Sequence, residues 1–337
     1  MRTAVVGASG YAGSELLRVM ASHDELDVVL ATGESNAGVS VAQHVPALAA
    51  VYPSLVFSTT ASVHETDLDV AFLALPHGTS QDLVRSLVTR GVMVVDLGAD
   101  FRFNDALSYK TWYKDDHQAP ELLDKAVYAL VERHRSDIVG ASLLAIPGCY
   151  PTATALALGP FFDADVVEKT GVVVDALSGV SGAGRATSDR LHFSRLAGNA
   201  EAYGLLDHRH TGEMEMELGA SVLFTPHLIP VARGELVTAY ATTKGALSTA
   251  KAMAILHEAY DNEPFVVVTN EPPTLKDPLG SNVCFVSARV DARTGWLVAM
   301  SSIDNLLKGA AGQAVQAFNV ARGLDETMGL SRTGITP

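Results

Sequence analysis

Short apolar runs alternate with amphipathic segments over the first half of the chain. The run D-V-A-F-L-A-L at 69–75 is nearly continuous, which is typical of a strand buried on both faces of a parallel sheet. Strands that alternate with helices at this spacing predict a doubly wound α/β domain. The predicted strands are 3–6, 27–31, 69–75, 92–95 and 141–146, and the predicted helices are 14–22 and 80–90.

The pattern changes beyond residue 170, where apolar runs predict a second sheet and 248–260 has helical spacing. The polar, aromatic segment 103–138 is predicted to be an irregular excursion. A long amphipathic helix is predicted at 303–321, packing back on the first domain. We therefore predict a dinucleotide-binding domain over 1–148, completed by 303–330, and a catalytic and oligomerisation domain over 149–302. The strands predicted for the second sheet are 172–175, 222–229, 235–243, 265–269, 282–290 and 296–301.

The stretch L-A-I-P-G-C-Y-P-T-A-T-A-L-A-L-G-P at 144–160 carries a candidate nucleophile. An apolar run ends in Pro147-Gly148, Cys149 follows, and an Ala- and Leu-rich run then predicts a helix with Pro151 in its first turn. A cysteine at the start of a helix lies at the positive end of the helix dipole, which favours the thiolate. A small buried apolar cysteine is the alternative.

A glycine turn follows the first strand, with the sequence G-A-S-G-Y-A-G at 7–13. Strand, glycine turn and helix form the context of a dinucleotide-binding loop, although the spacing is G-x-x-G-x-x-G rather than G-x-G-x-x-G. The glycines let the backbone approach a pyrophosphate bound at the start of the helix. The cofactor contacts predicted here are Gly7, Ser9, Gly10, Tyr11, Ala12 and Gly13.

The end of the second strand leaves the choice between NAD and NADP open. Glu34 is placed to bind a ribose 2′-OH, whereas Thr32, Ser35 and Asn36 offer hydroxyl and amide donors suited to a 2′-phosphate. We predict Ser35 as a cofactor contact. Later strands also end in loops where ligands of such sheets bind, at Leu75-Pro76-His77-Gly78 and at 96–102. Thr79 is predicted to cap the helix that follows.

Two segments of the second domain carry candidate polar groups. L-S-G-V-S-G-A-G-R at 177–185 predicts a loop that offers hydroxyls, amides and Arg185 to an anion, with a surface linker as the alternative. In the H-R-H-T motif at 208–211, a histidine is placed to take and return a proton, and Thr211 is predicted to cap a helix. No metal is expected, since no further Cys or His lies nearby in sequence.

Composition narrows the class of protein. The chain has 337 residues, 48% of them hydrophobic and 18% charged, enough for a large core and two domains. Its net charge of −14 argues against nucleic-acid binding and against an anionic membrane surface, but not against a small anionic substrate. Two cysteines far apart, Cys149 and Cys284, make no disulfide framework, and the first residues carry no signal-peptide pattern. A cytoplasmic protein is expected.

The motifs together resemble those of the N-acetyl-gamma-glutamyl-phosphate reductases over nearly the whole length. The chain departs from the family's usual pattern at Ile146, where asparagine is usual, and at 129–132, where Gly-Leu-Pro-Glu is usual. The motifs that carry the resemblance are G-A-S-G-Y-A-G at 7–13, F-L-A-L-P-H-G at 72–78, D-L-G-A-D-F-R at 96–102, P-G-C-Y-P-T-A at 147–153, S-G-V-S-G-A-G-R at 178–185, H-R-H-T at 208–211 and S-S-I-D-N-L-L-K-G-A-A-G-Q-A at 301–314.

The resemblance implies an NADP-dependent enzyme of arginine biosynthesis with a Rossmann domain and an α+β catalytic domain like that of glyceraldehyde-3-phosphate dehydrogenase. It implies that Cys149 is the nucleophile and that His208 or His210 is the acid/base, with a slight preference for His210. A homodimer or homotetramer acting on a small molecule is expected. Predicted substrate contacts are Arg102, Ser178, Ser181, Arg185 and Arg209; further predicted cofactor contacts are Leu75, Pro76, His77, Gly182 and Asn305.

The expected reaction is reduction of N-acetyl-L-glutamyl 5-phosphate to the 5-semialdehyde through a Cys149 thioester. Two alternatives remain open from the sequence. One is an enzyme for another acyl phosphate, such as aspartyl phosphate or a carrier-linked aminoadipyl phosphate, because P-G-C alone also allows aspartate-semialdehyde dehydrogenase. The other is a dinucleotide-sensing regulator that has lost catalysis.

Overall fold

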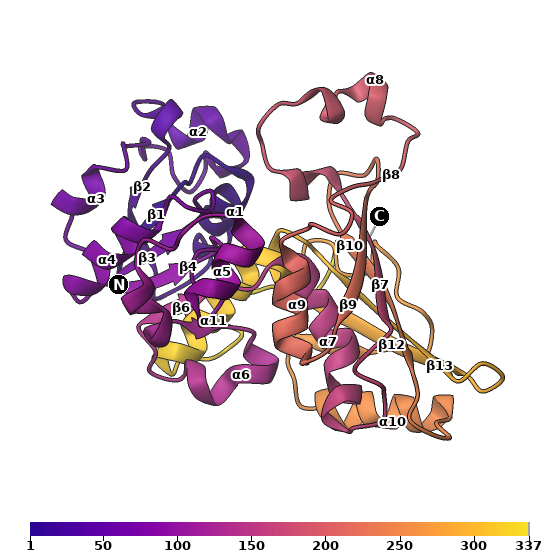
Figure 1. Ribbon diagram of the computed structural model, residues 1–337. Helices are drawn as coiled ribbons and strands as arrows, with labels where there is room; N and C mark the ends of the chain where they lie inside the picture. The colour runs from indigo at the N-terminus through magenta and orange to yellow at the C-terminus, as the bar shows by residue number, and fades with distance from the viewer. Residues whose placement is uncertain (336–337) are drawn as a thin grey trace. The chain divides into compact units, whose positions relative to one another are not determined.

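A computed structural model describes residues 1–335 of the chain. Their contacts divide the chain into two compact units. Unit 1 comprises Met1–Pro147 with Ala310–Leu330, and unit 2 comprises Gly148–Gly309 with the segment from Ser331 onward. The chain therefore leaves unit 1 immediately before the candidate nucleophile and returns to it near the end (Figure 1).

Unit 1 contains a six-stranded parallel sheet with the strand order β2-β1-β3-β4-β6-β5. Since the chain runs outward from β1 in both directions, the sheet is doubly wound, as predicted, and the glycine turn after β1 lies at the topological switch point. The strands are β1 (Arg2–Val6), β2 (Asp27–Ala31), β3 (Val70–Leu73), β4 (Met93–Asp96), β5 (Val127–Tyr128) and β6 (Leu143–Ala145).

Unit 1 also contains the helices and turns between these strands and one helix from the end of the chain. The helices are α1 (Tyr11–Met20), α2 (Val41–His44), α3 (Ser62–Glu65), α4 (Gln81–Thr89), α5 (Ala106–Tyr113), α6 (Val131–Ile138) and α11 (Gly312–Arg322), with 3-10 turns η1 (Glu34–Asn36), η2 (Pro46–Leu48) and η3 (Pro120–Lys125).

The prediction that 103–138 is irregular was wrong. The segment contains α5, α6, β5 and η3. Helix α5 buries only Tyr109 and Tyr113, which are four residues apart and stack at 4.8 Å between ring centroids. Because residues at this spacing share one helix face, two aromatic rings suffice to anchor a helix whose other residues are exposed or partly exposed. The Asp105 side chain caps it by accepting from the amide of Ser108.

Both predicted threonine caps were also wrong. The Thr79 hydroxyl donates to the carbonyl of Pro76 at 2.6 Å, and Ser80 is the N-cap of α4. Helix α9 (His210–Leu218) begins one residue before Thr211, and its N-cap Arg209 makes no side-chain cap. At α4, the buried carboxylate of Asp100 accepts instead from the amide and hydroxyl of Ser80.

The helix predicted at 303–321 is shorter and begins later. Strand β13 (Trp296–Ile303) continues to Ile303, a π-helical turn follows at Leu307–Ala311, and α11 begins at Gly312. The Asp304 carboxylate accepts from the amides of Leu306 and Leu307, which ends the strand and opens the turn. Helix α11 is buried along nearly its whole length and belongs to unit 1.

Unit 2 contains a seven-stranded mixed sheet with the order β11-β12-β13-β10-β7-β9-β8. Pairs β7–β9 and β11–β12 are parallel and the other pairs antiparallel, so this unit is α+β, as expected. The remaining strands are β7 (Val172–Ser178), β8 (Glu201–Ala202), β9 (Val222–Leu228), β10 (Glu235–Thr242), β11 (Val266–Val268) and β12 (Cys284–Asp291); the helices are α7 (Cys149–Asp163), α8 (Phe193–Leu196), α9 and α10 (Thr249–Tyr260), with 3-10 turns η4 (Val180–Ala183) and η5 (Asp189–Leu191).

Helices cover one face of this sheet, as Figure 1 shows for α7, α9 and α10. One hydrogen bond joins α7 to the sheet, since the Ser301 hydroxyl of β13 donates to the Ala153 carbonyl. Another joins two helices, since the Tyr260 hydroxyl of α10 donates to the Leu156 carbonyl of α7. Along β10, buried residues alternate with half-buried ones. The second face of the sheet therefore remains partly open.

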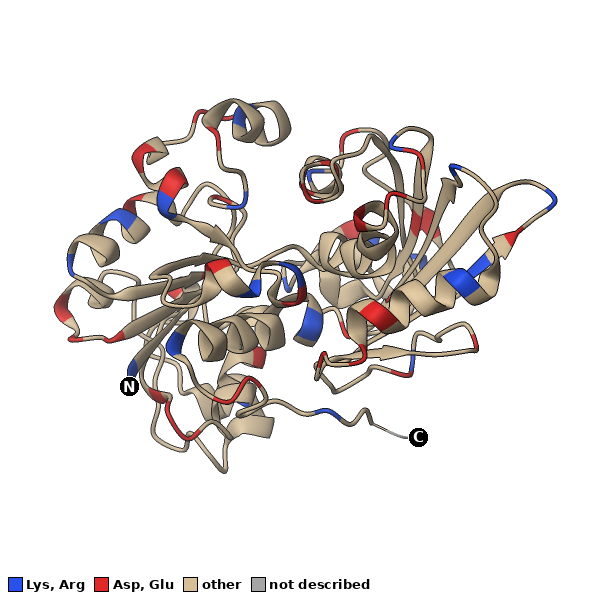
Figure 2. Cartoon of the chain, turned by 90° about the horizontal axis from the view of Figure 1, so that it is seen from below, with Lys and Arg blue, Asp and Glu red and all other residues tan. Residues whose placement is uncertain are grey.

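Lys and Arg positions are interspersed with acidic ones in each unit (Figure 2). Among the described residues, no helix has both the length and the apolar character needed to cross a bilayer.

The glycine turn after β1 yields a stability prediction. Gly7 has φ +82°, and a Cβ there would lie 2.4 Å from the Ala74 carbonyl oxygen. Gly7→Ala should therefore lower the free energy of unfolding by at least about 2 kcal/mol, measured by urea denaturation. Gly245→Ala is the matched control, because nothing lies within 4 Å of its added Cβ. Equal stability of the two variants would contradict this description of the turn.

Candidate active site

Cys149 is the first residue of α7, a helix of 15 residues with no acidic residue in its first turn. The N-cap is Gly148, which has no side chain to cap the first amides of the helix. The sulfur therefore lies at the positive end of an uncapped helix, an environment that favours the thiolate. Cys149 is partly exposed, whereas Cys284 is fully buried. The prediction that Cys149 opens a helix is confirmed.

Two groups of unit 2 fix the backbone at the cysteine. The fully buried Glu213 of α9 accepts from the Gly148 amide through Oε1 at 2.7 Å. A Cβ built on Gly309 would lie 2.7 Å from Cys149 Cβ. Only glycine permits this approach of the π-helical turn to α7, so Cys149 is held from two sides.

An aromatic cluster surrounds the two histidines of the H-R-H motif. The ring of Tyr150 meets those of His208 and His210 edge-on, at 5.6 and 5.8 Å between centroids, and the two histidine rings lie 4.9 Å apart. The Tyr150 and Tyr203 hydroxyls are hydrogen-bonded at 2.8 Å. The structure therefore brings both predicted acid/base residues beside the residue that follows Cys149.

The two histidines differ in their protonation chemistry. His208 Nδ1 accepts from the backbone amide of His210 at 3.2 Å, so its ring carries the proton on Nε2 when neutral. Burial, and then the charge of Arg209, lower the pKa of His208 to about 4. His208 is thus a neutral imidazole near pH 7. His210 begins α9 and is partly exposed.

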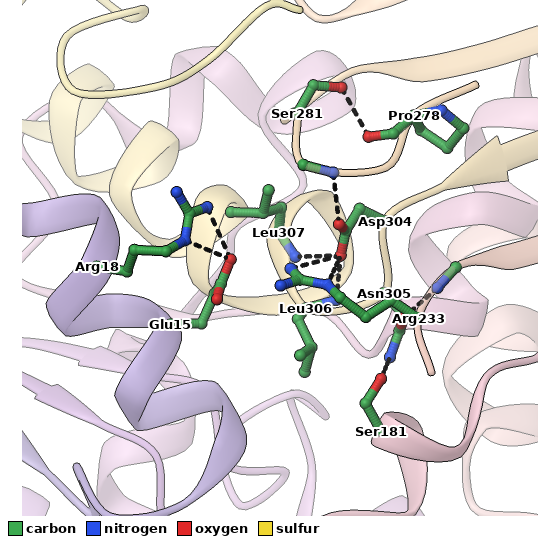
Figure 3. A network of polar contacts seen from close by, with 12 residues as sticks. Glu15, Arg18, Ser181, Arg233, Pro278, Ser281, Asp304, Asn305, Leu306 and Leu307 are labelled. Carbon is green, nitrogen blue, oxygen red and sulfur yellow. Dashed lines mark hydrogen bonds and ion pairs between the residues drawn. The ribbon is translucent and has the colours of Figure 1, made fainter. Parts of the chain in front are cut away.

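A polar network holds the glycine-rich loop in place (Figure 3). The buried Asn305 side chain donates to the Ser181 hydroxyl at 2.9 Å and accepts from the Gly234 amide at 2.8 Å. Gly182 is exposed, and a Cβ there would lie 2.9 Å from Ser178 Oγ. The amide of Asn305 therefore fixes the loop, a role that the sequence did not predict.

The predicted arginines fall into two groups. Arg185, the last residue of the loop, and Arg209, the middle residue of the H-R-H motif, are exposed. Arg102, in unit 1, is buried, with Nε donating to the Ile146 carbonyl at 2.8 Å and Nη2 to the Leu97 carbonyl at 3.0 Å. Through these two bonds Arg102 connects the backbone at Leu97 to the backbone at Ile146, a role that the sequence did not predict.

The predicted dinucleotide loop in unit 1 is tightly folded. A Cβ on Gly13 would lie 2.3 Å from the Gly7 carbonyl oxygen. Helix α1 has Gly10 as its N-cap, no side-chain cap and no acid in its first turn, so the positive end of its dipole suits a pyrophosphate. Tyr11 is exposed beside them. The residues present therefore fit a dinucleotide.

Two further loops of unit 1 carry predicted cofactor contacts. Ser35 is exposed in η1, next to Asn36, whose amide donates to its hydroxyl at 3.2 Å. Glu34 accepts from the Thr60 amide, and this bond lowers its pKa. Leu75 is partly exposed and Pro76 and His77 are exposed. Asp100 holds this second loop by accepting from the Gly78 amide at 2.6 Å.

Sequence reasoning missed three polar groups of unit 2. Neither Glu213 nor Tyr203 was predicted as a site residue, and Glu235 was predicted only as the first residue of the strand 235–243. The sequence pattern could have indicated Glu235, because this charged residue occupies an inward position of the alternating strand E-L-V-T-A-Y. Glu213 and Tyr203 depend on tertiary contacts that no local pattern reveals.

Comparison with known proteins defines the class. A family model described as the semialdehyde dehydrogenase NAD binding domain matches residues 2–141, and one described as the semialdehyde dehydrogenase dimerisation domain matches 149–305. The chain belongs to the semialdehyde dehydrogenase family. Its fold is similar to aspartate semialdehyde dehydrogenase II from Vibrio cholerae (TM-score 0.71, 20% identity, 95% and 97% of the two chains) and to the Candida albicans enzyme solved with NADP (TM-score 0.67, 14% identity, 95% and 97%).

Full-length relatives narrow the family further. The chain is 45% identical to the N-acetyl-gamma-glutamyl-phosphate reductase of Symbiobacterium thermophilum, over 99% of this chain and 98% of that protein. It is 41% identical to the protein of the same name from Desulforamulus reducens, over the whole of both. The resemblance found in the sequence is thereby confirmed.

The bond between Glu213 and Gly148 yields a second prediction. Glu213→Leu leaves a buried amide without an acceptor and should cost about 1 to 3 kcal/mol of unfolding free energy, measured in urea. Glu213→Gln keeps an acceptor oxygen at the same place and should lose less than half as much. If both variants were as stable as the wild type, the bond would not be what holds the N-cap of α7.

Proposed function

We propose that this protein catalyses the NADPH-dependent reduction of N-acetyl-L-glutamyl 5-phosphate to N-acetyl-L-glutamate 5-semialdehyde and phosphate, a step of arginine biosynthesis. The observation that carries the proposal is the cysteine at the mouth of α7, with two histidines packed around the neighbouring Tyr150. Full-length relatives at 45% and 41% identity that bear the name of this reductase support the choice of substrate.

Cys149 is the nucleophile of the proposed reaction. Its thiolate attacks the carbonyl carbon of the acyl phosphate, the carbon–sulfur bond forms, and the bond from that carbon to the phosphate oxygen breaks. Phosphate leaves and the acyl group remains on sulfur as a thioester, which splits one difficult step into two easier ones. The helix dipole supports the ionised sulfur at the start and again when the aldehyde departs.

NADP is the proposed cofactor, and when bound in reduced form it supplies the hydride that reduces the thioester carbonyl. The glycine turn and the uncapped start of α1 fit its pyrophosphate. The Glu34 carboxylate accepts a hydrogen bond from the Thr60 amide, and it is therefore less suited to accept one from a ribose 2′-OH. Ser35 and Asn36 lie beside it with polar groups suited to a 2′-phosphate, and this favours NADP over NAD.

His210 is the proposed acid/base. His208 has its Nδ1 occupied by the His210 amide and a pKa lowered to about 4, so it protonates poorly at neutral pH. His208 therefore orients the start of α9, and His210 gives a proton to the carbonyl oxygen after reduction and takes it back as the aldehyde forms.

Anionic groups of the substrate have exposed partners in unit 2. Arg185 and Arg209 offer exposed, planar guanidinium groups, and Ser181 offers a partly exposed hydroxyl. Ser178 is less suited to this role, because it is buried and donates to the Gly179 carbonyl. These arginines are better placed to bind an entering anion than Arg102, which is buried and donates to two carbonyls.

A homodimer or homotetramer is the proposed assembly, formed through the open face of the unit 2 sheet. This face carries Leu177 and Leu223, which are 36% and 51% exposed. The match of this unit to a dimerisation domain supports the assignment. The proposed location is the cytoplasm, where a reducing environment keeps the thiol of Cys149 free.

Cys149→Ser should abolish reductase activity while leaving NADP binding unchanged, because a serine hydroxyl at neutral pH is a far weaker nucleophile than a thiolate. Activity is followed at the nicotinamide absorbance band with N-acetyl-glutamate semialdehyde, phosphate and NADP, and cofactor affinity by titration calorimetry. Cys284→Ser is the matched control, since that thiol is buried. Undiminished turnover in the Cys149 variant would overturn the assignment.

The same assay separates the proposed substrate from its rivals. N-acetyl-glutamate semialdehyde should give a kcat/KM at least about a hundredfold above aspartate semialdehyde, because a site that binds an acyl amide leaves polar groups unpaired with a substrate lacking it. Preference for the aspartate compound would replace the proposed substrate. Cofactor binding without turnover of any aldehyde would favour a sensor.

A further inference from the structure

Glu235 is a buried acid that the proposed mechanism does not use. It is the first residue of β10 and is 0% exposed. It shares the inward face of the strand with Val237, Ala239 and Ala241, all fully buried. This face packs against α7, whose first residue is Cys149. Glu235 pairs across the sheet with Ile303, and Gly309 lies against both Ile303 and Cys149, so the carboxyl group lies close to the nucleophile.

Both carboxyl oxygens of Glu235 are buried, and apart from Cys149 no described residue provides either with a hydrogen bond. Its neighbours across the sheet offer none, because Ser178 donates to the Gly179 carbonyl and Ile303 has no polar side chain. An ionised carboxylate without donors is strongly disfavoured in such a place, whereas a neutral carboxylic acid is tolerated.

The charged groups of the surrounding elements do not neutralise Glu235. Arg233, two residues before it, is paired with Asp304 at 2.9 Å. The Lys308 ammonium lies 6.0 Å from the centre of the Phe265 ring. Tyr150 and Tyr203 have raised pKa values, chiefly through burial, with the charge of Glu235 as a further cause.

The balance of these effects favours the protonated acid at neutral pH. Burial raises the pKa of Glu235 to about 8, although its interaction with the Cys149 side chain acts in the opposite direction. Burial outweighs that interaction, since no positive group compensates the desolvated carboxylate. A buried carboxylic acid that stays neutral so that it can donate a hydrogen bond is a known catalytic device.

We propose that Glu235 is a catalytic residue that remains a protonated carboxylic acid and donates a hydrogen bond to the Cys149 sulfur, stabilising the thiolate. The proposal rests on the nucleophile role assigned above to Cys149. No proton is transferred, because the O–H bond stays on Glu235 while the sulfur is acylated. When the carbon–sulfur bond breaks and the thiolate re-forms, the same O–H group donates to the sulfur again.

This arrangement has a consequence at alkaline pH. Below about pH 8 the neutral acid supports the thiolate; above it the carboxyl ionises, the donor is lost, and a negative charge opposes full ionisation of the thiol. Two interacting groups titrate as a pair. The rate at which Cys149 is alkylated should therefore rise with pH in two steps, the upper one belonging to the second ionisation of the pair.

Alkylation of Cys149 by iodoacetamide, measured against pH without substrate or cofactor, tests the proposal. Glu235→Gln keeps a neutral donor and should be alkylated near pH 7 within about twofold of the wild-type rate, with a single step. Glu235→Leu lacks the donor and should react roughly tenfold more slowly at that pH. Glu215→Gln is the matched control, the same change at a partly exposed acid of α9, and should keep both steps. Cys149→Ser supplies the blank, because Cys284 is buried.

Two steps retained in Glu235→Gln, or equal rates near pH 7 for the Leu and Gln variants, would overturn the proposal. A Glu235→Gln protein that fails to fold would also contradict it, because the amide reproduces the size and neutrality of the acid. Failure of the proposed function looks different: the alkylation profiles would be as expected, while N-acetyl-glutamate semialdehyde is not oxidised.

Discussion

The start of α7 is the constraint on which the described chemistry depends. A helix that begins with a reactive residue must leave its first amides uncapped, and the surrounding chain must then fix the N-cap by other means. Here Glu213 accepts from the Gly148 amide, and Gly309 lets the π-helical turn approach Cys149. The aromatic ring that follows, Tyr150, positions both histidines. One helix terminus thus organises groups from α9 and from the segment after β13.

Groups of both signs act on the start of α7, so its electrostatic potential is not set by the helix dipole alone. The helix dipole favours a negative sulfur, but two buried acids, Glu213 and Glu235, lie in the same unit. They differ in their partners, since Glu213 has a backbone donor and Glu235 has none apart from Cys149. Burial with a donor permits a charge, whereas burial without one favours the neutral acid. The environment of each carboxyl therefore determines what it can do for the thiol.

The sequence predicted the features that local patterns encode. Continuous apolar runs gave the strands of unit 1, and Pro147-Gly148-Cys149 followed by an Ala-rich run gave the start of α7. Features that depend on distant contacts were missed. Helix α5 is held by only two aromatic rings on a polar segment, and α4 receives its cap from Asp100 rather than from an adjacent threonine. The role of Asn305 in fixing the Ser181 loop likewise becomes visible only once β13 and β7 are folded into one sheet.

Capture of the covalent intermediate tests the central claim most directly. The protein is mixed with N-acetyl-glutamyl phosphate in the absence of any nicotinamide, and phosphate release and peptide masses are measured. The account predicts one equivalent of phosphate per Cys149 and an N-acetyl-glutamyl group on the peptide that carries this residue. Release of phosphate with the acyl group on another residue, or no acylation at all, would contradict it.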